Sequence, residues 1–127
     1  MSIQIQYPKK PDTPVSHLPF SPVVRVGDLL FVSGQASVDA TGKIVSDTFD
    51  GEVRRSMENM KKILEDAGSD MQHVVQTRNY VRDSEMVPRY NELYREYFSA
   101  PYPARTTITN CLSSALKYEV ECIAVVK

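Results

Sequence analysis

Histidine, cysteine and glycine are scarce in this chain of 127 residues, and tryptophan is absent. The two histidines, His17 and His73, are far apart, and the two cysteines, Cys111 and Cys122, do not form a Cys-x-x-Cys motif. Isolated residues of this kind lack the spacing of metal ligands, so no metal site is expected. The five glycines form no loop that would cradle a phosphate group, so a phosphate-binding loop is not expected either.

The chain also lacks an excess of charge and any long apolar run. It has 15 Lys and Arg against 16 Asp and Glu, and the resulting net charge of −1 gives no global attraction to nucleic acid or anionic lipid. No apolar run approaches the roughly 20 residues that span a bilayer, and residues 1–6 lack the core of a signal peptide. We therefore expect a cytoplasmic protein with no membrane and no nucleic-acid partner. Its two cysteines are then expected as reduced thiols, although a disulfide remains the alternative.

The length and the apolar pattern predict a single domain, residues 1–127, that contains both strands and helices. Five of the eight prolines fall in residues 8–22, which predicts a non-helical arm. Gly27-Asp28 between two apolar runs predicts a tight hairpin. Short runs of strand-forming residues predict strands at 3–7, 23–26, 29–32, 74–81, 105–110 and 118–126.

Two segments have the three- and four-residue spacing of amphipathic helices. The first is expected to begin near Asp50 and to stop at Gly68. Its apolar stripe is Val53, Met57, Met60, Leu64 and Ala67. The second is expected to begin at Ser84 or Glu85, with Pro88 in its first turn, and to be closed by Pro101. Its stripe is Tyr90, Leu93, Tyr94, Tyr97 and Phe98.

The last predicted strand is apolar on both faces. Side chains alternate along a strand, so Val120, Cys122, Ala124 and Val126 share one face, and Ile123 and Val125 share the other. Two helices can cover only one face of a sheet, and a second subunit is the simplest cover for the other face. The pattern therefore predicts an α+β fold in a homo-oligomer.

Arg105 and Glu119 are the main candidates for chemistry. Arg105 opens a strand after Pro103-Ala104, and its planar guanidinium can bind a carboxylate through two hydrogen bonds. The alternative is a surface arginine in a salt bridge. Glu119 and Glu121 share one strand face about 7 Å apart, so the pKa of one carboxyl is expected to rise and to favour proton exchange. Ordinary ion pairs with Lys or Arg are the alternative for the two acids.

Four separate motifs resemble those of the YjgF/RidA family of reactive-intermediate (enamine/imine) deaminases. They are Ser33-Gly34-Gln35, Asn91-x-x-Tyr94-x-x-x-Phe98, Pro103-Ala104-Arg105 and Glu119-Val120-Glu121-Cys122-Ile123-Ala124-Val125. The resemblance runs in order from about residue 19 to residue 126. It implies a chorismate-mutase-like α+β fold, in which a mixed sheet has two helices on one face. It also implies a trimer around a central barrel, with ligand pockets between subunits.

The resemblance further implies a reaction: hydrolysis of a 2-imino acid, in equilibrium with its enamine, to a 2-keto acid and ammonia. The usual substrate class is 2-aminoacrylate/2-iminopropionate, and neither a cofactor nor a metal is required. By this resemblance Arg105 would bind the substrate carboxylate and Glu119 would position the attacking water. Further residues expected at the substrate are Ser33, Gly34, Phe20, Thr107 and Asn91.

Two of these positions depart from the family pattern, which leaves other functions open. Phe20 stands where members close to the archetype have tyrosine, and Thr107 stands where they have cysteine. One alternative is a side-branch deaminase that acts on another enamine, such as an aminomuconate. Another is a non-catalytic trimer that binds a small carboxylate, although Glu119 would not help to bind an anion. An endoribonuclease, a label that some members carry, is disfavoured by the net charge of −1.

Overall fold

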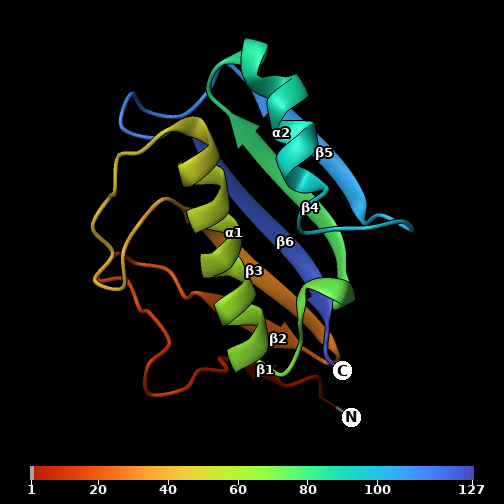
Figure 1. The fold of residues 1–127 in the computed structure, drawn as a ribbon. Coiled ribbons are helices and arrows are strands. Elements are labelled where there is room, and N and C mark those ends of the chain that lie inside the picture. Colours follow the sequence, from red (N-terminus) through yellow and green to blue (C-terminus); the bar gives the residue numbers. More distant parts are fainter. Residues whose placement is uncertain (1) are drawn as a thin grey trace.

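Two helices lie on the same face of a six-stranded sheet in the computed structural model, which describes residues 2–127 (Figure 1). The sheet order is β1-β2-β3-β6-β4-β5, and every neighbouring pair is antiparallel except β4 and β5, which are parallel. The predicted α+β fold, a mixed sheet with two helices on one face, is confirmed. The strands are β1 (Ile5–Gln6), β2 (Val23–Val26), β3 (Leu29–Ala36), β4 (Val74–Val81), β5 (Ala104–Thr109) and β6 (Tyr118–Val125).

The hairpin of β2 and β3 forms where Gly27-Asp28 predicts it. Gly27 has φ +59°, a left-handed conformation that glycine adopts without steric cost. Strand β3 is longer than the predicted 29–32 and runs to Ala36. A bulge between Val32 and Gln35 lets the chain resume pairing with β6, where Gln35 lies opposite Val120. The bulge falls within Ser33-Gly34-Gln35 and sets the position of Gly34 on the sheet.

The first helix, α1 (Phe49–Asp66), agrees with the prediction. The side chain of Thr48 caps its N-terminus by accepting a hydrogen bond of 3.1 Å from the Gly51 N–H. The helix stops just before Gly68, which has φ +86°. The whole predicted stripe is buried against the sheet: Val53, Met57, Met60, Leu64 and Ala67.

The second helix is shorter than predicted. A 3-10 turn, η2 (Ser84–Met86), leads into α2 (Val87–Tyr94), and Pro88 lies in the first turn as expected. The α-helix ends at Tyr94, and the next turn mixes i→i+3 hydrogen bonds, from the Glu96 and Tyr97 N–H groups, with one i→i+4 bond from the Phe98 N–H. Phe98 is nevertheless buried and packs on Tyr94, with ring centroids 4.6 Å apart. The apolar stripe thus indicates which side chains are buried more reliably than where the helix ends.

Strand β4 shows one error in the predicted facing of side chains. The sequence pattern predicts that Val75 shares a face with Thr77, but Val74 is buried and Val75 is 45% exposed. A bulge between Val74 and Gln76 in the pairing with β6 shifts the alternation by one residue. From Thr77 to Val81 the predicted facing holds, with Thr77, Asn79 and Val81 buried beneath the helices. Just before β4, a short 3-10 turn, η1 (Met71–His73), places His73 against Asp70.

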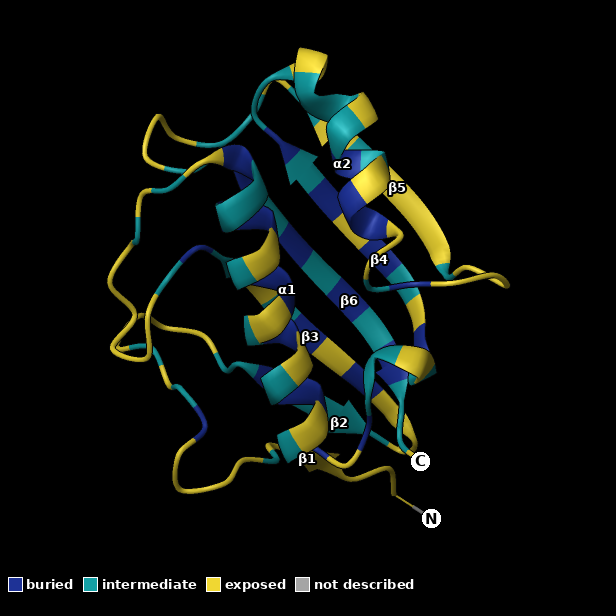
Figure 2. Cartoon of the chain, viewed as in Figure 1, coloured by how far each residue is buried: buried dark blue, intermediate teal, exposed yellow. Residues whose placement is uncertain are grey.

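The two faces of β6 have different neighbours, as predicted. Tyr118, Val120, Cys122 and Ala124 are buried beneath the helices, whereas Ile123 and Val125 are half-buried on the opposite face (Figure 2). Within residues 2–127 no helix covers that opposite face, which we call the open face. It carries large apolar side chains that are 41–45% exposed: Leu29, Phe31, Val75 and Ile108. An apolar area of this kind on a sheet is typical of a subunit interface.

Glu52 of α1 is fully buried and ties the helix to the start of β6. Its carboxylate accepts hydrogen bonds from the backbone N–H and from the Nζ of Lys117, both at 3.0 Å. It also accepts one from the Asp47 N–H at 3.2 Å, while Lys117 Nζ donates to the Asp47 carbonyl at 2.7 Å. This cluster fixes the position of Lys117, the residue directly before Tyr118. It thereby fixes the start of β6, where Glu119 lies.

We predict that Glu52→Ala lowers the free energy of unfolding by about 3 kcal/mol, because three donors lose a buried carboxylate partner. Urea denaturation followed by circular dichroism measures the change. Glu65→Ala, on an exposed position of the same helix, is the matched control and should change the stability little. An equal, small effect of both substitutions would show that the cluster does not hold this part of the fold together.

Neither α1 nor α2 is long and apolar enough to cross a membrane, and the same holds for every helix in residues 2–127. Cys111 and Cys122 are free thiols. Burial raises the pKa of the Cys122 thiol to about 12, so this group stays protonated at neutral pH.

Candidate functional site

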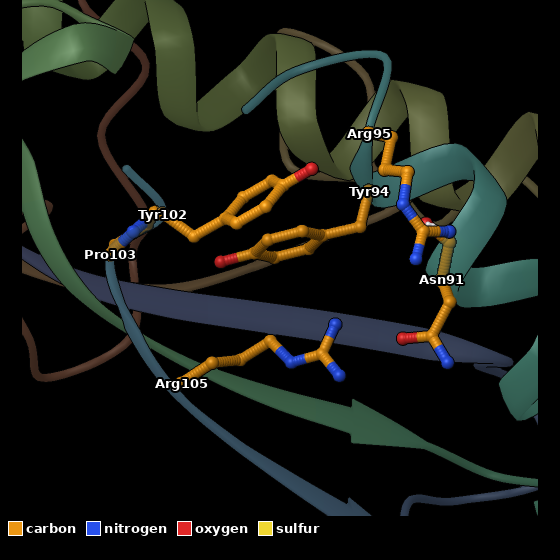
Figure 3. A pocket seen from close by; sticks show the side chains of 6 residues that line it. All are labelled: Asn91, Tyr94, Arg95, Tyr102, Pro103 and Arg105. Carbon is orange, nitrogen blue, oxygen red and sulfur yellow. Dashed lines mark hydrogen bonds between the residues drawn. The ribbon is translucent and has the colours of Figure 1, made fainter. Parts of the chain in front are cut away.

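Arg105, at the start of β5, contributes to a cavity of about 300 Å³ between β5 and the end of α2. The residues that line the cavity, which we call the arginine pocket, are Asn91, Tyr94, Arg95, Tyr102, Pro103 and Arg105 (Figure 3). Asn91, predicted at the substrate, therefore lies beside Arg105. Tyr102 and Pro103 belong to the segment that leads into β5. The pocket thus combines a helix, a strand and the connection between them.

The Arg105 guanidinium lies over two aromatic rings. Its Cζ atom is 5.0 Å from the ring centroid of Tyr90 and 5.0 Å from that of Tyr94. At this distance the negative face of each ring attracts the cation, which favours one orientation of a long and flexible side chain. No carboxylate among residues 2–127 forms an ion pair with Arg105. Its charge therefore remains free for an anionic ligand.

The two tyrosines beneath Arg105 are themselves held by a buried network of hydrogen bonds. Tyr94 Oη and Thr77 Oγ1 are 2.8 Å apart, and Tyr90 Oη and Thr107 Oγ1 are 3.2 Å apart. The amide of Asn79 donates to Thr77 Oγ1 at 3.0 Å and accepts from Tyr118 Oη at 2.6 Å. Thr107, predicted near the substrate, thus fixes a ring under the guanidinium. Burial raises the pKa of Tyr90 to about 12, so its hydroxyl stays neutral.

Glu119 lies on the open face of the sheet, directly against Gly34. A Cβ atom at position 34 would collide with the Oε2 of Glu119, so only glycine leaves room for this carboxylate. Burial and the neighbouring charge of Glu121 raise the pKa of Glu119 above its ordinary value of 4.5. Among residues 2–127 no hydrogen-bond donor contacts the Glu119 carboxylate, whereas Glu121 accepts a short hydrogen bond from Tyr80 Oη. Glu119 is therefore the acid that is free to act on a ligand.

Ser33 directly precedes Gly34 on β3, and Phe20 belongs to the proline-rich arm beside it. Ser33 Oγ donates a hydrogen bond of 2.5 Å to the carbonyl of Ser21, so its hydroxyl anchors the proline-rich arm at β3. Phe20, 48% exposed, lines a separate cavity of about 280 Å³ together with Gly34. We call Phe20, Ser33, Gly34 and Glu119 the glutamate group. The structure thus divides the predicted site residues into two sets, the glutamate group and the arginine pocket with Thr107.

These two sets lie on opposite faces of the sheet in one chain. Strand β4 separates β5 from β6, and Arg105 is opposite Thr77, whose hydroxyl points toward α2. Glu119 is opposite Tyr80, whose hydroxyl contacts Glu121 on the open face. The sequence motifs predict Arg105 and Glu119 at one substrate. Within one chain, Arg105 lies with the other residues of the arginine pocket and Glu119 lies beside Gly34. The structure does not bring Arg105 and Glu119 together within that chain.

Sequence reasoning missed several residues of the arginine pocket. The Tyr90/Tyr94 stripe predicts core residues, and both rings are buried, but they also form the surface on which Arg105 rests. Arg95 and Tyr102 carry no pattern that links them to Arg105. Only their positions in the sequence connect them with the predicted site residues, because Arg95 directly follows Tyr94 and Tyr102 directly precedes Pro103. Among residues 2–127 no group of three His, Cys, Asp or Glu side chains is placed to hold a metal ion.

The chain is similar to known proteins over nearly its whole length. A family model described as Endoribonuclease L-PSP matches residues 11–126. A RutC family protein from Pyrococcus abyssi is 34% identical in sequence, and the match covers 98% of this chain and 98% of that protein. A protein from Dermatophagoides farinae named 2-iminobutanoate/2-iminopropanoate deaminase is 31% identical, over 86% of this chain and 87% of that protein. The structure is similar to the crystal structure of E. coli TdcF with bound serine, with a TM-score of 0.83 and 29% sequence identity. The match covers 96% of this chain and 99% of the TdcF chain.

Proposed function

The chain belongs to the endoribonuclease L-PSP family, which is the YjgF/RidA family, and from this premise we propose that it hydrolyses reactive 2-imino acids. In the proposed reaction a 2-imino acid and water give a 2-keto acid and ammonia. One relative is named for this activity on 2-iminobutanoate and 2-iminopropanoate. The observation that carries the proposal for this chain is the Arg105 guanidinium, oriented by two tyrosine rings and paired with no carboxylate within residues 2–127.

Arg105 is proposed to bind the substrate carboxylate. A guanidinium presents two parallel N–H donors that match the two carboxylate oxygens, and Asn91 adds an amide at the side of the same pocket. The related TdcF crystal structure has bound serine, a small molecule with a carboxylate, which supports a ligand of this class. Binding by the carboxylate leaves the imine carbon free for attack.

Glu119 is proposed to handle the water. An imine is already electrophilic, so the enzyme needs chiefly to orient a water molecule and to move protons. The ionised carboxylate takes a proton from the water as its oxygen bonds to the carbon of the protonated imine, and the electron pair of the C=N π bond moves to nitrogen. Glu119 then returns the proton to the nitrogen of the carbinolamine. The C–N bond breaks as the hydroxyl group loses its proton to the departing ammonia, which gives the 2-keto acid and ammonium. Burial and the charge of Glu121 raise the pKa of Glu119, which makes its carboxylate a stronger base toward the water. No metal or cofactor is needed for these steps.

The complete site is proposed to form between two subunits. The arginine pocket and the glutamate group lie on opposite faces of the sheet, so one chain cannot bring Arg105 and Glu119 together. A trimer in which the open faces of three sheets enclose a central barrel would cover the exposed apolar side chains. It would also place the arginine pocket of one protomer beside the glutamate group of its neighbour.

We therefore predict a homotrimer in solution, because the open face carries Leu29, Phe31 and Ile108 at 41% exposure. Light scattering at micromolar concentration should give three times the chain mass of 14.4 kDa. Phe31→Lys, on the open face, should weaken the assembly, whereas Val15→Lys, on the proline-rich arm, should not. A wild-type mass of 14.4 kDa would contradict both the trimer and the shared site.

We predict that Gly34→Ala lowers keto-acid release at least about tenfold with little loss of stability. The new methyl group would displace the Glu119 carboxylate, and a displaced side-chain end costs less than a displaced backbone. Gly42→Ala is the control for a strained glycine substitution far from Glu119: its Cβ meets no atom within 4 Å, but φ +86° costs stability, so it should lower the stability and leave the rate of the folded protein unchanged. A coupled assay measures the rate of keto-acid release, and thermal denaturation measures the stability. An unchanged rate in Gly34→Ala would show that the observed position of Glu119 does not matter for turnover.

The activity itself is tested by generating 2-aminoacrylate in situ. A pyridoxal-phosphate-dependent dehydratase acting on serine supplies the intermediate, and pyruvate release is followed with and without this protein. The proposal expects faster pyruvate release in proportion to the concentration of added trimer. The same assay with Arg105→Ala controls for contaminating activity. Release at the spontaneous rate at every protein concentration would contradict activity on 2-aminoacrylate and would favour another enamine, such as an aminomuconate.

A second candidate function is binding of a small carboxylate without turnover. It is favoured by one observation: the arginine pocket, with Arg105 and Asn91, is present in a single chain without Glu119. This candidate predicts tight carboxylate binding, no acceleration of imine hydrolysis, and no effect of Glu119→Gln on binding. The net charge of −1 gives no comparable support to an endoribonuclease.

A further inference from the structure

Arg95 provides a second free cation in the arginine pocket. It is exposed at the C-terminal end of α2, and its Nη1 lies 3.4 Å from the carbonyl oxygen of Asn91. Figure 3 shows the guanidinium groups of Arg95 and Arg105 and the Asn91 amide directed toward the same space from α2 and β5. The pocket thus contains two guanidinium groups and an amide.

The acidic residues nearest to Arg95 along the chain are paired with other arginines. Glu92 lies 3.6 Å from Arg89, and Glu96 lies 2.9 Å from Arg54 of α1. Of the eight arginines in the chain, only Arg78, Arg95 and Arg105 have no ion pair within residues 2–127. Two of these three line the same pocket.

Two unpaired guanidinium groups that line one pocket carry like charges, which repel each other. In a chain of net charge −1 this is a local concentration of positive charge. A ligand with one carboxylate neutralises only one of the two groups. A ligand with a second acid group neutralises both and gains a second charge-assisted hydrogen bond.

On this basis we propose that the preferred ligands of the arginine pocket are 2-keto and 2-imino acids with a second carboxylate, held by Arg95. This inference rests on the proposed function for the role of Arg105 and specifies its substrate class. Two separate carboxylates fit better than one phosphate group. No residue of the first turn of α2 lines the pocket, so the free backbone N–H groups of a helix N-terminus, which usually bind phosphate, are not available there.

The test compares two keto acids of equal chain length, 2-oxopentanoate and 2-oxoglutarate, which differ in the second carboxylate. Calorimetric titration of the wild-type protein should show that 2-oxoglutarate binds about tenfold or more tightly than 2-oxopentanoate. One additional charge-assisted hydrogen bond accounts for a difference of this size. Arg95→Gln should remove this preference and leave the affinity for 2-oxopentanoate unchanged. Arg25→Gln, which removes the same charge from a half-buried position on β2 where Arg25 pairs with Asp28, should keep the preference. Inorganic phosphate should compete far more weakly than 2-oxoglutarate.

Several results would overturn the assignment of Arg95. They are equal affinities for the two keto acids, a preference that survives in Arg95→Gln, and competition by phosphate as strong as that by 2-oxoglutarate. The test also separates this inference from the proposed function. If 2-imino monocarboxylates are hydrolysed but no dicarboxylate preference exists, only the role of Arg95 fails. If 2-oxoglutarate binds through Arg95 but no imine is hydrolysed, the dicarboxylate site stands and the deaminase proposal fails.

Discussion

Arg105→Ala is expected to abolish keto-acid release and to weaken binding of small carboxylates such as pyruvate at least about 30-fold. Arg105 is exposed in the single chain, but the neighbouring subunit of the proposed trimer would cover it, and losing one partner of a covered, hydrogen-bonded charge pair has an effect of this size. The fold should remain intact, because the side chain rests on Tyr90 and Tyr94 without an ion pair among residues 2–127. Calorimetric titration with pyruvate and the coupled pyruvate-release assay measure the two losses.

The control for Arg105→Ala is Arg105→Lys, which keeps the charge but not the planar pair of donors. Binding should be partly retained in the lysine variant, with turnover still low because the substrate is held in the wrong orientation. Thermal denaturation of each variant confirms that the assembly is preserved. If the alanine variant binds pyruvate with unchanged affinity, the carboxylate is held elsewhere on the protein.

Glu119→Gln is expected to lower turnover about 10²-fold or more while carboxylate binding is kept or strengthened. Glutamine retains the size of glutamate but cannot take a proton from water, and the substitution removes a negative charge that opposes an anionic ligand. In the proposed mechanism the active form of the wild-type protein has an ionised Glu119, so turnover should fall as the pH drops through the pKa of Glu119. Burial and Glu121 place that pKa above 4.5, so this loss should begin at a higher pH than for an exposed glutamate.

Glu121→Gln is the matched control for Glu119→Gln. It lies on the same face of β6, but its carboxylate already accepts a hydrogen bond from Tyr80, and this bond raises the pKa of Tyr80 to about 12. We expect turnover of this variant to stay within a few-fold of wild type. If instead Glu121 is essential and Glu119 dispensable, the catalytic roles of the two acids are reversed. If neither substitution changes the rate, the carboxylate-binding function replaces the deaminase.

The fold was largely predictable because its strongest signals are local. The stripe of α1 and the two-faced apolar pattern of β6 each follow from side-chain periodicity, and both are confirmed. The facing of Val75 and the extension of β3 to Ala36 were not predictable. Both depend on bulges, which arise from pairing between distant strands and leave no clear mark on the local sequence.

The candidate site was predictable residue by residue but not as an arrangement. Short motifs identified Arg105, Asn91 and Glu119, yet which sheet face each occupies depends on the strand order. The register pairs Arg105 with Thr77, which faces α2, and pairs Glu119 with Tyr80, which faces the open side of the sheet. Arg95 could not be found from a motif, because its relevance comes from the cavity that it shares with Arg105.

Activity of mixed trimers tests most directly the central claim that Arg105 of one subunit and Glu119 of another act on the same substrate. Arg105→Ala and Glu119→Gln chains, each inactive alone, are co-expressed in equal amounts with different tags, and trimers that carry both tags are isolated. In a cyclic trimer that contains both chains, one of the three sites combines an intact arginine pocket with an intact glutamate group from another chain, so the isolated trimers should restore about a third of the wild-type rate. Trimers shown to contain both tags but to release pyruvate no faster than the spontaneous reaction would contradict the shared site.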